Sequence, residues 1–170
     1  MAECITDSLV TFPLPEMDPC YFCEIIRGNV ERWNVIDETE LTVTLLNGRQ
    51  FEVGQCIVIP VRHAPTLLDL NDGEAAAVMA AAKQAARAML RAFTPPPNGV
   101  LLYQNNGIGS GQEVPHFHMH VVPRGRESDW GFGPPHITRL EQSRPPTHLD
   151  HVVITDAKRR TVEQLRQAHR

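Results

Sequence analysis

Three histidines at alternate positions, His116, His118 and His120, are the residues of this sequence best suited to chemistry. Successive side chains of a β-strand point to opposite faces, so the three imidazoles would share one face of a strand. Histidine titrates near ~6.5, and such a row offers a nucleophile, hydrogen-bond donors and proton carriers at neutral pH. A neutral ring nitrogen can attack phosphorus while a neighbouring ring donates a proton to the leaving group. The pattern therefore indicates phosphoryl-group chemistry.

Two other interpretations of the same histidines stay open. His-x-His on a strand is also a metal-binding pattern, and the chain would then be a zinc-dependent hydrolase with two of these rings as ligands. The histidines could also be accidental residues of an exposed edge strand. The apolar residues between them, Phe117 and Met119, argue against accident because they give the strand a face to bury.

A glycine-rich turn precedes the histidines, with Gly107, Gly109 and Gly111 at alternate positions. Glycine lets the backbone approach an anion closely and point N–H groups at it. The turn does not match the dinucleotide-binding fingerprint G-x-G-x-x-G, because Gln112 occupies the position of the last glycine. Glycine-rich hairpin loops usually have only a structural role, so the turn by itself does not predict a ligand.

The segment from His116 to Val122 resembles the signature of the histidine-triad (HIT) family, His-φ-His-φ-His-φ-φ, in which φ is an apolar residue. The resemblance extends from Cys20 to Arg124. Pro115 and Pro123 also resemble bacterial members of that family. Upstream, the residues at the positions of the family's phosphate turn are Asn105, Gly107, Gly111 and Gln112.

The resemblance implies a hydrolase or nucleotidyl transferase that acts on nucleotide phosphoramidates, adenylates or dinucleoside polyphosphates. His118 would be the nucleophile, forming a nucleotidyl-histidine intermediate, and His120 and Gln112 would contact the α-phosphate. The remaining substrate-binding positions would be Asn47, Asn105, Gly111 and Glu113. A non-catalytic nucleotide-binding regulatory module is the alternative, although binding alone needs no middle histidine.

Many bacterial members of the family carry a structural zinc, and this chain has residues at the matching positions. They are the pair Cys20 and Cys23, the histidine that follows an apolar strand, His63, and the first triad histidine, His116. Two thiolates and two imidazoles suit tetrahedral zinc, and a closed set of four ligands would be structural rather than catalytic. The alternative is a pair of buried thiols without a metal. If His116 binds zinc, its ring cannot also act as a free proton carrier.

Three positions depart from the commonest residues of the family. Asn47 stands where an aspartate usually accepts hydrogen bonds from the ribose hydroxyls, and asparagine keeps an acceptor but loses the charge. Gln55 replaces a frequent histidine. Glu113 replaces a serine or threonine, and its charge should disfavour anionic leaving groups and favour amines.

The hydrophobic periodicity predicts an α+β fold, an antiparallel five-stranded sheet with a long helix on one face and a C-terminal helix, the helices being segregated to one face. The long helix should bury a stripe formed by Met79, Ala82, Ala86, Met89 and Phe93. The expected helices span residues 21–27, 73–93 and 156–168, and the expected strands 32–37, 41–46, 55–60, 100–104 and 115–123.

The chain divides into an N-terminal leader (1–19), a HIT domain (20–124) and a C-terminal tail (125–170) that contains the terminal helix. In the tail, Trp130, Phe132 and His136 are candidates to close over the leaving group. The resemblance also implies a homodimer with the long helix and the strand at 100–104 in its interface.

Composition excludes several classes of protein. The formal net charge is −4 and the pI about 6.0, which argues against a broad basic surface for nucleic acid. No stretch approaches the roughly 20 apolar residues that cross a bilayer, so we expect no membrane partner. The first residues lack the basic start and apolar run of a secretory signal, and we expect a cytoplasmic protein with reduced cysteines.

Overall fold

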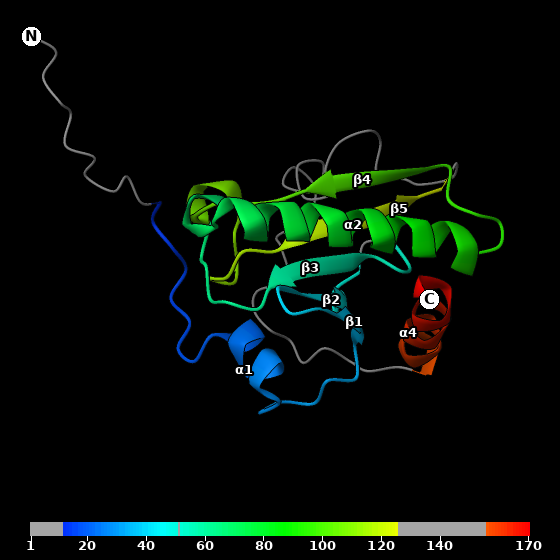
Figure 1. Ribbon diagram of the computed structural model, residues 1–170, viewed down its shortest axis with the longest axis horizontal. Helices are drawn as coiled ribbons and strands as arrows, with labels where there is room; N and C mark the ends of the chain where they lie inside the picture. The colour runs from blue at the N-terminus through cyan, green and yellow to red at the C-terminus, as the bar shows by residue number, and fades with distance from the viewer. Residues whose placement is uncertain (1–11, 51, 126–155) are drawn as a thin grey trace, which may run out of the picture.

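The computed structural model describes residues 12–50, 52–125 and 156–170, and Figure 1 shows how their elements are arranged. Cys4 and the proposed tail residues Trp130, Phe132 and His136 lie outside these ranges. The helices are α1 (Tyr21–Arg27), α2 (Asp72–Ala92) and α4 (Asp156–His169), with 3-10 turns η1 (Leu67–Asp69) and η2 (Ile108–Ser110). The strands are β1 (Val35–Glu38), β2 (Thr42–Leu46), β3 (Cys56–Pro60), β4 (Gly99–Tyr103) and β5 (Met119–Arg124).

The five strands form one antiparallel sheet in the order β1-β2-β3-β5-β4. This confirms the predicted α+β class and the number of strands. The prediction that the last strand begins at residue 115 was wrong, because β5 begins at Met119. His116 and His118 therefore lie in the segment that leads into β5, with His116 in a bend, and of the three histidines only His120 is a strand residue.

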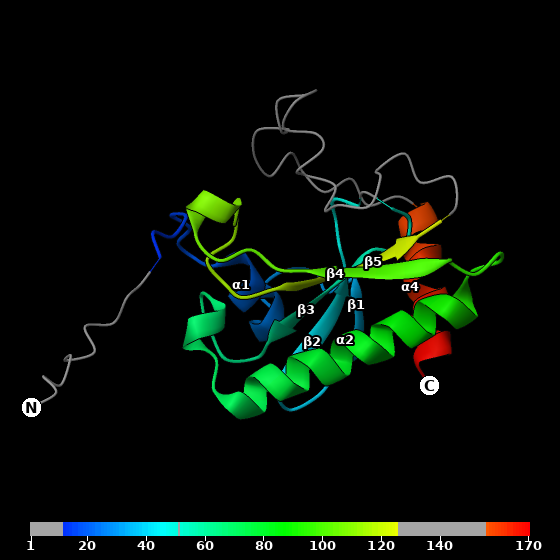
Figure 2. The same ribbon diagram turned by 90° about the horizontal axis from the view of Figure 1, so that it is seen from above.

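The helices lie on both faces of the sheet, which corrects the expectation that they share one face. Figure 2 shows α1 and α2 on opposite sides of the strands. On the α2 side, Val58, Phe117 and Val121 pack against the helix, and on the α1 side Phe22 and Ile25 pack against Ile57. Because β5 lies between two packed layers, alternate residues of its leading segment reach different environments.

Helix α2 begins with a capping box formed by Asn71 and Glu74. The Asn71 side chain accepts from the backbone N–H of Glu74, and the Glu74 carboxylate accepts from the backbone N–H of Asn71. The buried face differs from the predicted stripe, since Met79 is 51% exposed while Val78 is buried. The rest of the buried face consists mainly of alanines, which allow the helix to lie close to the sheet.

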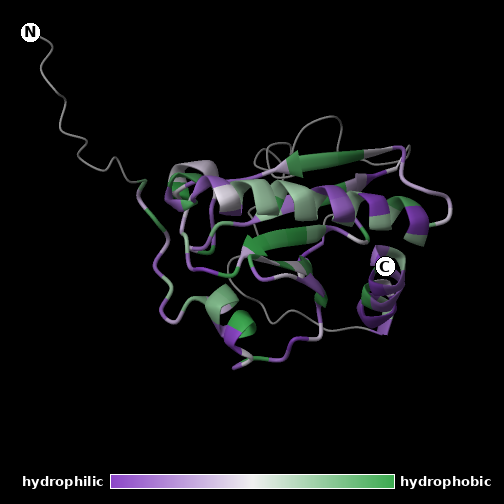
Figure 3. Ribbon diagram, in the orientation of Figure 1, coloured by the Kyte–Doolittle hydropathy of each residue, from purple (hydrophilic) through white to green (hydrophobic). Residues whose placement is uncertain are grey.

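Helix α4 is mostly hydrophilic on the outside, whereas β3 and β4 are among the most hydrophobic segments (Figure 3). Its Val162 and Leu165 nevertheless join the core on the α2 side of the sheet. Arg166 Nε donates to the carbonyl of Val35 at 2.8 Å, which fixes α4 against the edge strand β1. No helix of the described part is both long and apolar enough to cross a membrane.

Candidate active site and metal centre

The three histidines lie in a row on the face of the sheet that α1 covers. The ring centroids of His118 and His120 are 5.0 Å apart with planes inclined by 74°. Phe22 of α1 packs edge-on against both His116 and His118, at 5.9 Å and 5.4 Å. The intervening Phe117 points into the core on the α2 side. The structure thus brings the triad together as the alternation of polar and apolar residues predicts.

His118 is a buried residue whose tautomer is set by the backbone. Its Nδ1 lies 2.7 Å from the carbonyl oxygen of His116. A carbonyl can only accept, so Nδ1 must carry the proton and Nε2 of the neutral ring must carry a lone pair. Burial lowers the pKa of His118, which favours the neutral ring. The residue is therefore prepared to act as a nucleophile through Nε2.

His120 is held by two neighbours that the sequence analysis did not connect with it. Tyr103 is its direct cross-strand partner in the β4–β5 pair, and the two rings stack at 4.3 Å with planes 10° apart. Gln55 Nε2 lies 3.2 Å from His120 Nδ1. The sequence offers no signal that pairs residues 103 and 120, because the register between β4 and β5 is set by the tertiary fold.

The glycine-rich turn is closed mostly by its own hydrogen bonds. Gly107 N donates to Gln112 Oε1 at 2.6 Å, Gly111 N donates to the Ile108 carbonyl at 3.0 Å, and Ile108 N donates to the Pro13 carbonyl at 2.9 Å. The N–H groups of Gly107, Ile108 and Gly111 therefore already have partners, and the phosphate-binding role of the turn stays a prediction. Gly107 is required for a different reason: its φ is +77°, and a Cβ there would lie 2.6 Å from Phe12 Cβ.

Gln112 is a buried residue that ties this turn to the body of the protein. Its Nε2 donates to the carbonyls of Pro65 at 2.7 Å and Val114 at 2.9 Å, so both amide hydrogens are already used. Gln112 therefore holds the turn against the segment around Pro65, and its contact with the α-phosphate stays a prediction. The sequence could not reveal this, because Pro65 is distant along the chain.

The other predicted substrate residues line the loops around the triad. Asn105 Nδ2 lies 3.4 Å from the Gly111 carbonyl, where it supports the end of the turn. Asn47 follows β2, and its Oδ1 accepts from the backbone N–H of Arg49 at 3.2 Å. Glu113 is 64% exposed and forms an ion pair with Arg49, whose Nη1 lies 3.2 Å from Glu113 Oε2. Arg49 is a residue that the sequence analysis missed.

Cys20, Cys23, His63 and His116 form a cluster whose ligand atoms all lie within 4.8 Å of one another. Cys23 Sγ is 3.3 Å from His63 Nδ1, and His116 Nδ1 is 3.6 Å from both sulfurs. Sulfur and nitrogen ligands of a tetrahedral zinc ion are separated by about 3.5 Å. The residues therefore fit a four-ligand metal site. Among the described residues, His116 is the one triad histidine that belongs to this site.

The protonation of the cluster suits metal binding. His116 Nε2 donates to the Pro60 carbonyl at 3.0 Å, which leaves the Nδ1 lone pair directed at the two sulfurs. Burial lowers the pKa of His116 to about 4, so the ring is neutral. Burial, with the adjacent Cys20, raises the pKa of Cys23 to about 11, and a bound cation would offset this cost of forming the thiolate.

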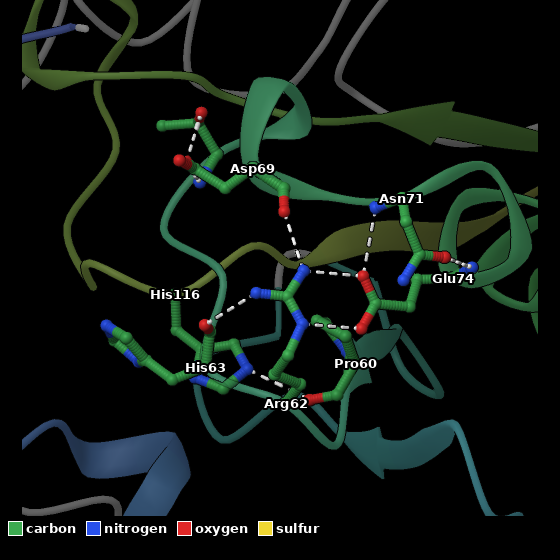
Figure 4. Close-up of polar contacts among 8 residues, drawn as sticks. Pro60, Arg62, His63, Asp69, Asn71, Glu74 and His116 are labelled. Carbon is green, nitrogen blue, oxygen red and sulfur yellow. Dashed lines mark hydrogen bonds and ion pairs between the residues drawn. The ribbon is translucent and has the colours of Figure 1, made fainter. Parts of the chain in front are cut away.

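The segment that carries His63 is anchored by its neighbour Arg62, as Figure 4 shows. The guanidinium of Arg62 binds both carboxylate oxygens of Glu74, at 2.7 Å and 2.6 Å, and donates to the Asp69 carbonyl at 2.6 Å. The hydrogen bond to Arg62 is the largest cause that lowers the pKa of Glu74, to about 2. The start of α2 thus fixes the strand end that presents a metal ligand.

Known proteins resemble this chain in sequence and structure. The family model described as HIT domain matches residues 29–127. Protein hit from Bacillus subtilis is 33% identical over 140 residues, which cover 82% of this chain and 93% of that protein. An adenosine 5′-monophosphoramidase from Schizosaccharomyces pombe is 30% identical over 114 residues, 67% of this chain and 80% of that protein.

A solved structure described as a zinc-bound histidine triad family protein from Mycobacterium smegmatis is 28% identical to this chain. Its TM-score is 0.68, over 89% of this chain and 93% of that one. The family model covers more than half of the sequence, and its matched range includes His63, the glycine-rich turn and all three histidines. The chain therefore belongs to the HIT-domain family.

Proposed function

We propose that this protein is a nucleotide hydrolase or nucleotidyl transferase that forms a covalent intermediate on His118. The observation that carries the proposal is the 2.7 Å hydrogen bond between His118 Nδ1 and the His116 carbonyl, because it leaves the lone pair on Nε2. A non-catalytic module for nucleotide binding would not need this preparation of the middle ring. The name of the Schizosaccharomyces pombe relative supports adenosine phosphoramidates as the first substrates to test.

The proposed reaction has two displacements at the α-phosphorus. In the first, His118 Nε2 forms a bond to phosphorus, and the bond to the leaving group breaks with its electron pair going to that group, which takes up a proton from solvent. In the second, water attacks phosphorus, the P–N bond breaks with its electron pair returning to Nε2, and the proton lost by the water passes to solvent as His118 returns to its neutral form. The product is the nucleoside 5′-monophosphate. A transferase would use another acceptor in place of water.

The neighbouring residues have separate roles in this proposal. His120 donates a hydrogen bond to the phosphate oxygens or to the leaving group. Asn105 and Gly111 form the wall of the phosphate site, and Asn47 binds the ribose with the acceptor capacity that remains on its Oδ1. Glu113 and Arg49 lie at the leaving-group side, where their pairing leaves the local charge balanced.

We also propose that the cysteine and histidine cluster holds a structural zinc ion. Two thiolates and two imidazoles are a donor set that zinc prefers, and four protein ligands leave no position for a reacting water. The ion would fix His116, and through its carbonyl the orientation of His118. The alternative of a zinc hydrolase that uses two triad histidines is less well supported, because His118 and His120 are outside the cluster.

A homodimer through α2 and β4 completes the proposal. β4 is an edge strand of the sheet, and Met79, Leu90 and Leu102 are large apolar residues exposed on these two elements. Exposed apolar residues that gather on one surface favour association. Sedimentation at micromolar concentration should give a dimer, and a chain that stays a monomer would contradict this part of the proposal.

Trapping of the intermediate tests the reaction directly. We expect adenosine 5′-phosphoramidate, mixed with the protein and quenched in base, to leave an adenylyl group that peptide mass spectrometry locates on His118. His118→Asn should abolish the adduct and most of the turnover while it retains nucleotide binding. An adduct on His120, or full turnover by His118→Asn, would contradict the mechanism. Nucleotide binding without turnover of phosphoramidates, adenylates and dinucleoside polyphosphates would favour the regulatory module.

A further inference from the structure

The surroundings of His120 differ from those of His118 in one chemical respect: the partner of its Nδ1 is a donor and not an acceptor. We propose that Gln55 and Tyr103 are positioning residues that hold His120 as the tautomer protonated on Nε2, opposite to the tautomer of His118. The assignment concerns the protein without substrate, and only its catalytic consequence rests on the proposed function.

The first step of the argument is the chemistry of the Gln55 amide. Its Nε2 lies 3.2 Å from His120 Nδ1, and an amide NH2 group can only donate. Nδ1 of His120 must therefore accept, which requires a lone pair on that atom. In the neutral ring the proton is then on Nε2.

Gln55 is itself held in place on several sides. Its side chain is 0% exposed, in the segment directly before β3. Its backbone N–H donates to the Glu52 carbonyl at 3.0 Å, and its carbonyl accepts from Asn47 N at 2.8 Å. The paired backbone groups fix the position of the Gln55 main chain, and the complete burial of the residue restricts rotation of its amide away from His120.

Tyr103 supplies the second constraint, on the plane of the imidazole. The stack at 4.3 Å, with planes 10° apart, fixes the tilt of the His120 ring. Burial raises the pKa of Tyr103 to about 12, against a lowering effect of its hydrogen bond with Gln55, so the phenol is neutral. Gln55 therefore contacts both members of the stack. The stack sets the ring plane, and the hydrogen bond sets which ring edge faces the amide.

The consequence is a pair of adjacent rings whose Nε2 atoms differ in protonation. His118 donates its Nδ1–H to a carbonyl and presents a lone pair at Nε2, whereas His120 accepts at Nδ1 and presents an N–H at Nε2. The two rings are 5.0 Å apart, close enough to act on one phosphate. His118 can attack the phosphorus while His120 donates a hydrogen bond to the phosphate or the leaving group, and neither ring needs to change tautomer before the first displacement.

Nuclear magnetic resonance of the protein labelled with ¹⁵N-histidine tests the assignment without any substrate. Long-range correlations from ring C–H protons to ring nitrogens distinguish a protonated nitrogen from one with a lone pair. The spectrum is recorded at a pH where the rings are neutral, and the His120 signals are identified as those missing from His120→Ala. We expect a protonated Nε2 and a bare Nδ1 on His120, with the reverse pattern on His118. Protonation of His120 at Nδ1 in the unaltered protein would overturn the proposal.

Two substitutions of Gln55 sharpen the test. Gln55→Glu keeps the shape of the side chain but places an acceptor beside Nδ1, so the proton of His120 should move from Nε2 to Nδ1. Gln55→Met, which buries no charge and removes the hydrogen bond, should give a mixture of tautomers. Retention of the pure Nε2–H form in a folded Gln55→Met protein would also overturn the proposal, even if Gln55→Glu does not fold.

The stack is tested with Tyr103. Tyr103→Phe keeps the ring and removes the hydroxyl, so the tautomer should persist. Tyr103→Leu removes the stack, and the ring signals of His120 should broaden or divide. An unchanged His120 spectrum in Tyr103→Leu would remove Tyr103 from the assignment.

Kinetics separate this inference from the proposed function. In a single turnover, Gln55→Met should slow nucleotidylation of His118 by less than the ~10²- to 10⁴-fold loss typical of removing an acid–base group, with KM nearly unchanged. Absence of turnover in the unaltered protein, together with the expected tautomers, would refute the proposed function and leave the assignment intact. An adduct on His118 together with an Nδ1–H tautomer of His120 would support the proposed function and refute the assignment.

Discussion

Arg49 and Glu113 form an ion pair between two loops beside the triad, with Arg49 Nη1 3.2 Å from Glu113 Oε2. The charge of Glu113 also acts to raise the pKa of Tyr103, the ring that stacks on His120. The pair therefore lies close to the proposed leaving-group side. From Glu113 alone we expected anionic leaving groups to be disfavoured. Because Arg49 balances the negative charge of Glu113, that preference should be weaker in the intact pair.

Removal of either charge should shift the choice of leaving group in opposite directions. Arg49→Gln leaves Glu113 unbalanced and should raise the ratio of phosphoramidate to dinucleoside polyphosphate turnover. Glu113→Gln leaves Arg49 available to anions and should lower that ratio. We expect changes of up to about fivefold, because exposed ion pairs contribute little. The ratio of kcat/KM values for the two substrates is the measurement, and a ratio that both variants leave unchanged would show that the pair has no part in specificity.

His120→Ala should slow the reaction without moving the covalent intermediate. The loss of one hydrogen-bond donor to the reacting phosphate typically costs ~10²- to 10³-fold in rate, whereas the nucleophile on His118 is retained. Quenched-flow measurement of the adduct should show slower formation on the same residue. Loss of the adduct with nucleotide binding intact would indicate instead that His120 is the nucleophile.

The metal cluster should be lost when one ligand is removed. Cys23→Ser should reduce the metal content from about one ion per chain to near zero and lower Tm, because structural zinc contributes folding free energy. Cys56→Ser is the matched control, since Cys56 is a buried cysteine of β3 outside the cluster. Elemental analysis of both variants is the readout. Equal zinc in Cys23→Ser and in the unaltered protein, or no zinc in either, would refute the site.

The Arg62–Glu74 pair predicts a pH-dependent contribution to stability. The hydrogen bonds of Arg62 and of the Asn71 backbone lower the pKa of Glu74 to about 2 in the folded chain, against about 4.3 for an unperturbed glutamate. The ionised carboxylate therefore stabilises the fold at neutral pH, and this contribution is lost as the pH falls from about 4.3 to about 2.

Glu74→Gln should accordingly lower Tm at pH 7, and the difference from the unaltered protein should narrow below about pH 4.3. Glu163→Gln on the exposed side of α4 is a control for loss of a carboxylate, because its contacts with Arg166 and Gln167 lie at the surface. Thermal unfolding of the three proteins across this range is the measurement. A constant difference at all pH values would contradict the role of the ionised pair.

The sequence predicted the elements and the chemistry of the triad better than the contacts between loops. The ranges of α1 and α2 followed from hydrophobic periodicity, and the ligand cluster followed from the resemblance to a family. Met79 was misplaced because an alanine-rich helix has several faces apolar enough to be buried. The contact of Gln112 with Pro65 was missed because that partner is brought near only by the tertiary fold.

Arg49 and Tyr103 were missed because their partners, too, are brought near only by the tertiary fold. Their roles depend on which loop or strand lies opposite each of them. Register between β4 and β5 places Tyr103 against His120, and that register cannot be read from either strand alone. Polar residues near a site are therefore predictable by type, but their partners are not.

The ligand cluster has a topological consequence. Cys23 and His116 are separated by 93 positions, and Cys20 and His116 by 96. An ion bound to Cys23 and His116 would join the two ends of the backbone between them into a closed loop. That loop would contain α2 and four of the five strands. A single backbone cut in the loop between β2 and β3 would then leave the two pieces joined through the ion as well as by packing, and removal of the ion with a chelator should lower the denaturant concentration at which the nicked protein dissociates.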